Sequence, residues 1–356
     1  MINIERPNLD QQDPAVRAYI EALEAELERL RQGRRRPRSV APVPPPNPTE
    51  PPTTINVITI NAAGMAKRTP RHLYSRQVRG GMGVFDLETP EDTPPAFLAI
   101  ADESQHLVLV TNQARGFRLP VNQLPESTVR SRGQSIIERF SFNPGERLAL
   151  AFADVGGTYV AMLTERGHVL WFAGHLFGKR LRSGTILYET KKFGPPSAAC
   201  WPPSDGDLFI ASRQGRGIRF STRQVPVRGC LGIRLGRDDV AVAITPVRAD
   251  SGVFLLTAEG KGTVRQMSSF RANKSPGAGG KTAMKTGHLI GALAVTGDDD
   301  VFAISRLSKL IRFPSTQVPP KEGVVQGVNC MALRADETVA MTVSPTLISA
   351  GDGKAE

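Results

Sequence analysis

The sequence predicts an all-β protein built from six repeated units, with one short helix near the N-terminus. A strand-like unit of roughly fifty residues recurs six times between residues 57 and 345. Its anchor positions, at residues 61, 111, 164, 212, 257 and 305, are separated by 50, 53, 48, 45 and 48 residues. A period of this size is typical of propellers and arrays, in which one unit cannot bury its apolar face alone. No convincing long amphipathic helix appears within the repeats.

The units share one internal order of elements. Each opens with an apolar, β-branched run and a polar turn, as in Ile58–Gly64 or Leu255–Gly260. A second short strand, often containing Arg, follows the turn. A basic, Gly-containing segment comes next, and then another apolar strand such as Ala96–Ala101 or Val240–Ile244. The pattern therefore predicts several short strands per unit.

Residues 14–32 are predicted to form one helix in an N-terminal segment, residues 1–33. Asp13 is a suitable N-cap, and Pro14 suits the first helical position. Apolar residues then recur at spacings of 4, 3, 4 and 3, which is a heptad seam: Val16, Ile20, Leu23, Leu27 and Leu30. The seam predicts a homodimer or a docked partner helix. Packing of the helix on its own domain is the alternative.

The chain then divides by composition. Residues 34–54 begin with an arginine cluster, Arg34 to Arg38, and continue as a Pro-rich segment that predicts an extended linker. Residues 55–345 hold the repeats, and residues 346–356 form a small, polar tail that we expect to be flexible.

Composition favours a polyanion as the partner. The chain has 45 Lys and Arg residues against 34 Asp and Glu, a net charge of +11 and a sequence pI near 9.9. Charge alone leaves DNA, RNA, a membrane surface and simple solubility open. No apolar run approaches the length of a membrane span and the N-terminus does not resemble a signal peptide, so we expect a cytoplasmic protein. The three cysteines form no Cys-x-x-Cys pair and the five histidines show no ligand spacing, so we expect neither a metal nor a cofactor.

Basic loops that contain glycine recur at nearly the same place in five of the six units. Glycine lets a backbone come close to a partner, and Lys and Arg contact phosphate oxygens. The sixth unit offers only Lys321-Glu322-Gly323-Val324, which is a poorer match. The residues that we expect to contact a polyanion through these loops are Arg76, Arg79, Arg130, Arg132, Arg180, Arg182, Arg228, Arg234, Lys274, Lys281 and Lys285.

The six units, together with the stretch Gln77-Val78-Arg79-Gly80-Gly81-Met82-Gly83, resemble the C-terminal domain found in the A protein of DNA gyrase and in its topoisomerase IV counterpart. The resemblance covers about residues 55–345. It implies a β-pinwheel, a propeller-like disc of six four-stranded blades. In that family a Gln-(Arg/Lys)-Arg-Gly-Gly-(Arg/Lys)-Gly box in the first blade is needed to wrap DNA around a basic rim. The resemblance adds Gln77, Gly80, Gly81 and Gly83 to the expected DNA-binding residues. Val78 and Met82 stand where the family has basic residues, so two of its charges are missing here.

Catalysis is not expected from this chain itself. The resemblance implies a catalytic tyrosine preceded by arginine in the full gyrase A protein, and none of Tyr19, Tyr74, Tyr159 and Tyr188 follows an arginine. We therefore predict a non-enzymatic, nucleoid-associated protein that binds and wraps double-stranded DNA, as an accessory to a type IIA topoisomerase. Two alternatives stay open: a propeller that serves as a protein-interaction platform, and a separate subunit of an active DNA topoisomerase.

Overall fold

The computed structural model describes residues 13, 14, 16, 17, 20, 21, 23 and 24, and residues 50–345 except 273 and 298. It divides into two compact regions, Met1–Asn47 and Pro48–Glu356. In the N-terminal region every described residue from Pro14 to Glu24 is helical, as the sequence predicts. Leu27, Leu30, most of the predicted linker and the predicted tail lie outside the described residues. Over the described part of the chain, no helix is long and apolar enough to cross a membrane.

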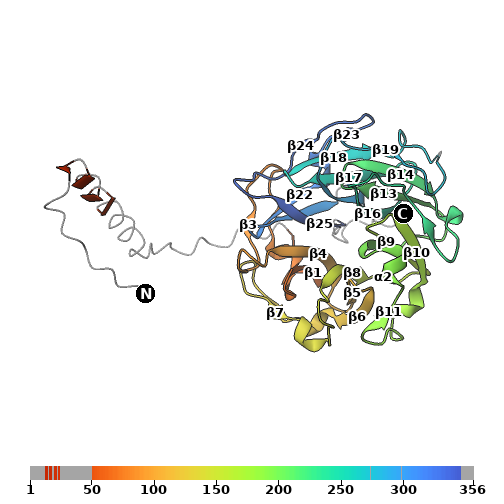
Figure 1. Ribbon diagram of the computed structural model, residues 1–356, viewed down its shortest axis with the longest axis horizontal. Coiled ribbons are helices and arrows are strands. Elements are labelled where there is room, and N and C mark those ends of the chain that lie inside the picture. Colours follow the sequence, from red (N-terminus) through yellow and green to blue (C-terminus); the bar gives the residue numbers. More distant parts are fainter. Residues whose placement is uncertain are drawn as a thin grey trace, which may run out of the picture. The chain divides into compact units, whose positions relative to one another are not determined.

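Six sheets in the region Pro48–Glu356 confirm the six-bladed, all-β prediction (Figure 1). Their strands pair antiparallel, apart from one short parallel pairing at the outer edge of the fifth blade. From the innermost strand outward, the first three blades are β4 (Pro95–Asp102), β1 (Ile55–Asn61), β2 (Met65–Pro70) and β7 (Gln134–Ser135); β8 (Leu148–Asp154), β5 (His106–Thr111), β6 (Arg115–Pro120) and β11 (Thr185–Ile186); and β12 (Pro196–Cys200), β9 (Tyr159–Thr164), β10 (His168–Ala173) and β15 (Cys230–Leu231).

The other three blades are β16 (Ala241–Val247), β13 (Asp207–Ser212), β14 (Arg216–Ser221) and β19 (Lys281–Thr282); β20 (Leu289–Val295), β17 (Gly252–Thr257), β18 (Lys261–Gln266) and β23 (Pro320–Lys321), with β24 (Val328–Asn329) also on β18; and β25 (Thr338–Ser344), β21 (Asp300–Ser305), β22 (Lys309–Pro314) and β3 (Val84–Phe85). Over the described residues of the region Pro48–Glu356, helical structure is limited to α2 (Thr190–Phe193) and six 3-10 turns. The turns are η1 (Arg71–Leu73), η2 (Val121–Gln123), η3 (Ile137–Arg139), η4 (Gly174–Leu176), η5 (Thr222–Gln224) and η6 (Ser315–Gln317).

The hydrophobic core is divided among the six junctions between neighbouring blades. Ile58 and Ile60 of blade 1, for example, are buried against Leu107 and Leu109 of blade 2. The last junction joins Val57 of blade 1 to the strands of blade 6 and closes the ring. Each sheet buries both faces against its neighbours, so the core of each blade depends on the blades beside it. The innermost strands β4, β8, β12, β16, β20 and β25 line the central channel (Figure 1).

The repeated anchor residues all perform the same local task. At each anchor the side-chain oxygen accepts a hydrogen bond from the backbone N–H four residues later, at 2.8 to 3.3 Å. The residue three positions after the anchor has a positive φ, which explains the glycine at Gly64, Gly167, Gly215 and Gly260. Asn, Thr and Ser recur at the anchor because their side chains can hold this turn.

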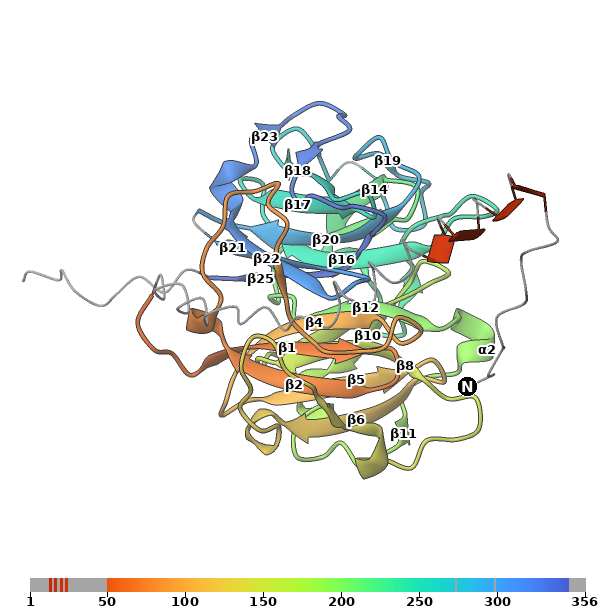
Figure 2. The same ribbon diagram turned by 90° about the vertical axis from the view of Figure 1, so that its left-hand side faces the viewer.

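Each blade is completed by the following unit of the sequence. The short outermost strand of blade 1, β7, comes from the second unit, and the same exchange continues around the ring. The sixth blade has no following unit, and β3 of the first unit takes the outermost place by pairing with β22. In Figure 2 the orange segment after β2 crosses to the strands of the sixth blade.

Candidate nucleic-acid interface

The basic loops predicted from the sequence lie at the outer edge of the blades. Each leads into or flanks one of the short outermost strands: β3 for Arg76 and Arg79, β7 for Arg130 and Arg132, and β11 for Arg180 and Arg182. The remaining predicted residues flank or lie in β15 and β19, and they are Arg228, Arg234, Lys274, Lys281 and Lys285. The strand exchange therefore sets the basic residues at successive blades along one rim.

The second-unit loop exposes its charges. The side chains of Arg130 and Arg132 are 73% and 87% exposed, and both approach Glu88, at 3.3 and 3.6 Å. Arg130 also lies over the ring of Phe85, 5.9 Å from its centroid, and Lys309 lies 5.7 Å from the same centroid. The two arginines share the exposed carboxylate of Glu88, and the exposed Glu126 of the same loop offsets part of their charge.

The loops of the third and fourth units and the fifth-unit lysines are also exposed. Arg180, Arg182, Arg228, Arg234, Lys274 and Lys285 form no ion pair with any carboxylate that the structure describes. Lys281 lies 4.2 Å from the centroid of the Phe270 ring and donates a hydrogen bond to the carbonyl oxygen of Ser269. Burial lowers the pKa of Lys281, and the positive charges of Arg265, Arg271 and Lys274 lower it further.

The glycine-rich box of the first unit lies against blades 5 and 6. The N–H of Gln77 donates to the carbonyl oxygen of Arg312 at 2.7 Å, and the N–H of Gly80 donates to that of Cys330 at 2.8 Å. Gly83 has a φ of 71°, and a Cβ there would lie 2.7 Å from the carbonyl oxygen of Leu310. Gly83 is therefore needed for a close backbone approach within the chain, at the point where β3 joins β22.

Arg76 and Arg79 also have partners within the chain. The Nε of Arg76 lies 2.8 Å from Oδ1 of the buried Asp300. Arg79 donates from Nε to the carbonyl oxygen of Gln317 at 2.8 Å and from Nη1 to that of Asn329 at 3.0 Å. From the sequence we expect these arginines to be phosphate ligands. The structure shows that they also bind the box to residues of the sixth unit.

Val78 and Met82 face outward. Their side chains are 74% and 47% exposed, so the two positions that carry basic residues in the resembling family are accessible here and uncharged.

A buried ionic network around the closure is absent from the sequence-based prediction. Glu50 accepts from Arg71 at 2.9 Å and from Arg312 at 2.8 Å, and Arg312 also contacts Asp300 at 2.5 Å. A second buried group joins Asp86 to Lys67. The Tyr74 hydroxyl donates to Asp86, and burial followed by that carboxylate raises the pKa of Tyr74 well above its usual value. These residues are far apart in the sequence, and no local pattern connects them.

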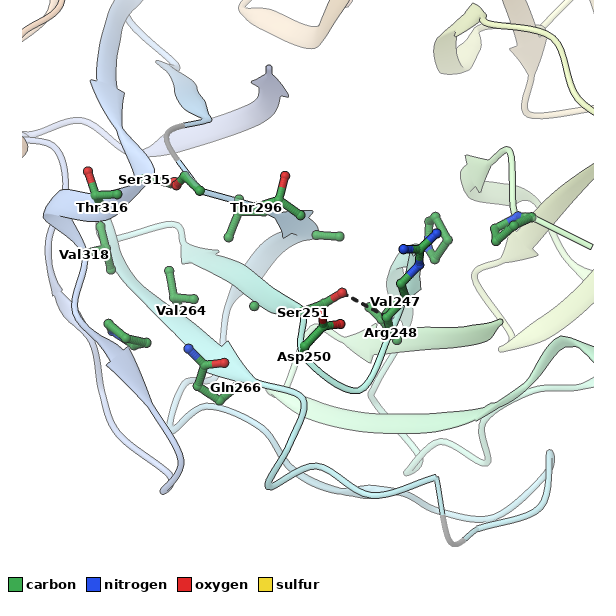
Figure 3. Close-up of a pocket in the computed structure, with 17 residues that line it drawn as sticks. Val247, Arg248, Asp250, Ser251, Val264, Gln266, Thr296, Ser315, Thr316 and Val318 are labelled. Atoms are coloured by element: carbon green, nitrogen blue, oxygen red, sulfur yellow. Dashed lines mark hydrogen bonds between the residues drawn. The ribbon is translucent and has the colours of Figure 1, made fainter. Parts of the chain in front are cut away.

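A hollow of about 650 Å³ lies between blades 4, 5 and 6 (Figure 3). It is lined by apolar and small polar residues, and its charged residues, Arg248 and Asp250, are both exposed. The backbone N–H of Arg248 donates to Ser251 at 2.9 Å, which is the bond drawn in Figure 3. In blades 4 and 6 the strand positions equivalent to Gly252 and Val264 hold the ion pairs Asp207–Arg219 and Asp300–Arg312. The hollow therefore marks the missing pair of blade 5, and its lining does not converge on a reacting centre.

Comparisons with known proteins agree with this architecture. The family model described as DNA gyrase C-terminal domain, beta-propeller, matches residues 56–92, 105–153 and 206–247, which fall in the first, second and fourth units. The DNA gyrase A protein of Mycobacterium bovis (strain BCG / Pasteur 1173P2) is 28% identical over 315 residues, covering 84% of this chain and 37% of that protein. The DNA gyrase A protein of Kosmotoga olearia is 25% identical over 300 residues, covering 80% of this chain and 37% of that protein.

Two solved structures share the fold. The structure of a DNA gyrase A C-terminal domain aligns with a TM-score of 0.71 at 20% identity, covering 81% of this chain and 99% of that one. The C-terminal domain of a DNA topoisomerase IV aligns with a TM-score of 0.54 at 14% identity, covering 81% and 93%. The chain spans little more than a third of the gyrase A proteins that it matches. The six exchanged blades and the glycine-rich box at the ring closure agree with these matches, and the propeller of this chain is similar to the DNA gyrase C-terminal domain, beta-propeller family.

Proposed function

We propose that this chain binds double-stranded DNA along the basic rim of its propeller and bends the duplex around it, without a catalytic centre of its own. The observation that carries the proposal is the placement of exposed Arg and Lys residues beside the outermost strands of successive blades. The names of the related gyrase and topoisomerase IV proteins support DNA as the polyanion.

Physical estimates favour bending by a rim of this kind. Each Lys or Arg that neutralises a phosphate releases condensed counterions, so affinity is independent of sequence and falls steeply with salt. Smooth bending of a short duplex by 40–90° costs on the order of 1–6 kcal/mol. Several modest contacts at successive blades together offset a cost of that size.

The test is a linking-number measurement. The purified chain is bound to nicked circular DNA across a salt series, the nick is sealed, and the linking number is read after the protein is removed. A shift that fades with salt supports wrapping and gives its hand. Binding without a shift would reduce the function to DNA tethering. Absence of binding even at low salt would reject DNA as the partner and favour a protein-interaction platform.

We further propose that the chain assists the catalytic part of a type IIA DNA topoisomerase in the cytoplasm, on the nucleoid. The support is its similarity to gyrase A proteins over little more than a third of their length. The test adds the chain in trans to a gyrase whose A protein lacks its C-terminal domain and measures supercoiling. An unchanged supercoiling rate at saturating chain would reject this partnership.

The N-terminal helix is proposed as a homodimer contact. Val16 and Leu23 of the predicted seam are about half exposed, although a heptad position is expected to be covered by a partner helix. Sedimentation equilibrium of the full chain and of Leu23→Asp tests this proposal. A dimer that becomes a monomer in the variant supports it, whereas the same mass for both proteins contradicts it.

A further inference from the structure

One strand position of the propeller carries a buried charge in a single blade. In blade 5, Arg265 of β18 pairs across the ladder with Val253, the second residue of β17. The equivalent pair of strands in every other blade has a residue at the same position. The other five blades hold an uncharged residue there: Thr69, Leu119, Phe172, Phe220 and Phe313. Three of these five belong to the apolar cores between blades.

Arg265 points toward the junction of blades 4 and 5. Side chains alternate along a strand, and its neighbours Val264 and Gln266 line the hollow on the opposite face of the sheet (Figure 3). Val253, directly opposite Arg265, belongs to the core between blades 4 and 5. Arg265 therefore stands where the neighbouring blades extend their hydrophobic core.

The guanidinium of Arg265 lacks the partners that a buried charge requires. The residue is only 5% exposed, and its Nε and Nη1 have no hydrogen-bond partner among the described residues. In blades 4 and 6, by contrast, Arg219 and Arg312 are each paired with an aspartate. An unpaired buried charge is strongly unfavourable, so its retention calls for a counter-ion.

The surroundings of Arg265 attract an anion. Arg265 lies 5.7 Å and Lys281 4.2 Å from the centroid of the Phe270 ring, so two cations share one aromatic ring. Burial lowers the pKa of Lys281, and the positive charges of Arg271 and Lys274, which are both exposed, lower it further. Burial lowers the pKa of Arg265 and the negative charge of Glu322 raises it, but Glu322 is exposed and forms no ion pair with Arg265 among the described residues.

We propose that Arg265 and Lys281, on either side of the junction between blades 4 and 5, form a phosphate-binding site. The site rests on the proposed function in that its natural occupant is a phosphodiester of the bound duplex, held at the rim beside β19. Planar guanidinium and flexible ammonium groups together suit a phosphate oxygen pair. This site gives the fifth unit an anchor that partly replaces the two charges missing from the box at Val78 and Met82.

Three variants of the full chain test the site. Arg265→Leu introduces the residue that blade 2 carries at Leu119, so the fold has a precedent for it. Glu322→Gln removes the competing carboxylate. Arg248→Leu removes one exposed arginine from the turn between β16 and β17 and serves as the control for net charge. Duplex binding is measured by fluorescence anisotropy across a salt series, and thermal unfolding is measured with inorganic phosphate against sodium chloride at equal ionic strength.

Arg265→Leu should weaken duplex binding about tenfold and reduce the salt slope by about one, whereas Arg248→Leu changes both much less. Glu322→Gln should strengthen binding. If the wild-type chain binds duplex and Arg265→Leu binds it with the same affinity, the phosphate site is overturned while the proposed function stands. If the wild-type chain binds no duplex, stabilisation by inorganic phosphate that Arg265→Leu abolishes would still support a phosphate site with a free anion as occupant. Absence of both effects would overturn the inference.

Discussion

Lys67 and Asp86 form a fully buried ion pair, with Nζ of the lysine 2.8 Å from Oδ1 of the aspartate and neither side chain exposed to solvent. Lys67 lies in β2 of blade 1, and Asp86 directly follows β3, the strand that completes blade 6. Thr59 and Tyr74 also donate to Asp86. The pair thus holds the exchanged segment against blade 1 while β3 pairs with blade 6, which secures the ring closure.

Asp86→Asn is expected to lower the free energy of unfolding by about 3–5 kcal/mol, because it leaves the charge of Lys67 buried without a counter-charge. Burial already lowers the pKa of Lys67, and Asp86 opposes that shift, so the variant should lower this pKa further. Urea unfolding of the full chain measures the effect. The matched control is Asp205→Asn, which breaks the exposed Arg223–Asp205 pair at 3.0 Å and should cost at most about 1 kcal/mol. Equal costs for the two variants would contradict the assigned role of Asp86.

Stability should fall in acid through Glu50. Burial raises the pKa of this carboxyl, but hydrogen bonds from Arg312 and Arg71 outweigh burial and hold the pKa below its usual value. A carboxyl with a lowered folded-state pKa stabilises the fold above its unfolded pKa, and this stability is lost as the pH falls through the folded value. The free energy of unfolding should therefore decrease below about pH 4.5.

Glu50→Gln isolates this effect. The variant should be less stable near neutral pH, by about 1.5–3 kcal/mol, because charge-assisted hydrogen bonds are lost, and its stability should depend less on acid than that of the wild type. Some acid dependence should persist, since Glu146 also has a lowered pKa, the net result of burial and stronger opposing hydrogen bonds. Urea midpoints from neutral pH to about pH 3 give both curves. Parallel curves would show that Glu50 does not contribute to the acid response.

Arg79 should have two separable roles. Arg79→Lys keeps the positive charge but cannot reproduce both bonds to the carbonyl oxygens of Gln317 and Asn329, so it should lose about 1–3 kcal/mol of stability and retain the salt slope of DNA binding. Arg79→Ala should lose both stability and about one unit of salt slope. Urea unfolding and anisotropy titrations on the same preparations measure the two quantities. An unchanged slope in Arg79→Ala would assign Arg79 to ring closure alone.

Restoring the charges of the box should strengthen DNA binding. Val78 and Met82 are exposed, so Val78→Arg with Met82→Arg should fold normally and increase the salt slope by up to about two. The control Val78→Gln with Met82→Gln adds polarity without charge and should leave the slope as it is. Affinity measured across a salt series distinguishes them. Equal slopes for the two double variants would mean that the DNA path does not approach this side of the box.

Local features of this protein were predictable from the sequence. The anchors at positions 61, 111, 164, 212, 257 and 305 identified six units, and the structure places the same hydrogen-bonded turn at each. Turn chemistry and apolar runs act over a few residues, which is the range that a repeat pattern reports. The recurring basic loops were found for the same reason, although their contact with DNA stays a prediction.

The exchange of outermost strands was not predictable from local patterns. Each of these strands is only two residues long, as in β3, too short for any alternation to identify. Their partners are set by which edge remains open after each blade has packed.

By itself, the sequence determined the six units, their turns, the positive charge and the placement of that charge in equivalent loops. Only the tertiary structure decided that β3 closes the sixth blade, that Arg79 reaches Asn329 across 250 positions of the chain, and that Arg265 is buried with two of its guanidinium nitrogens unpaired among the described residues. Local conformation follows from neighbouring residues, whereas these pairings arise when the ring closes and burial makes each charge depend on residues from distant units.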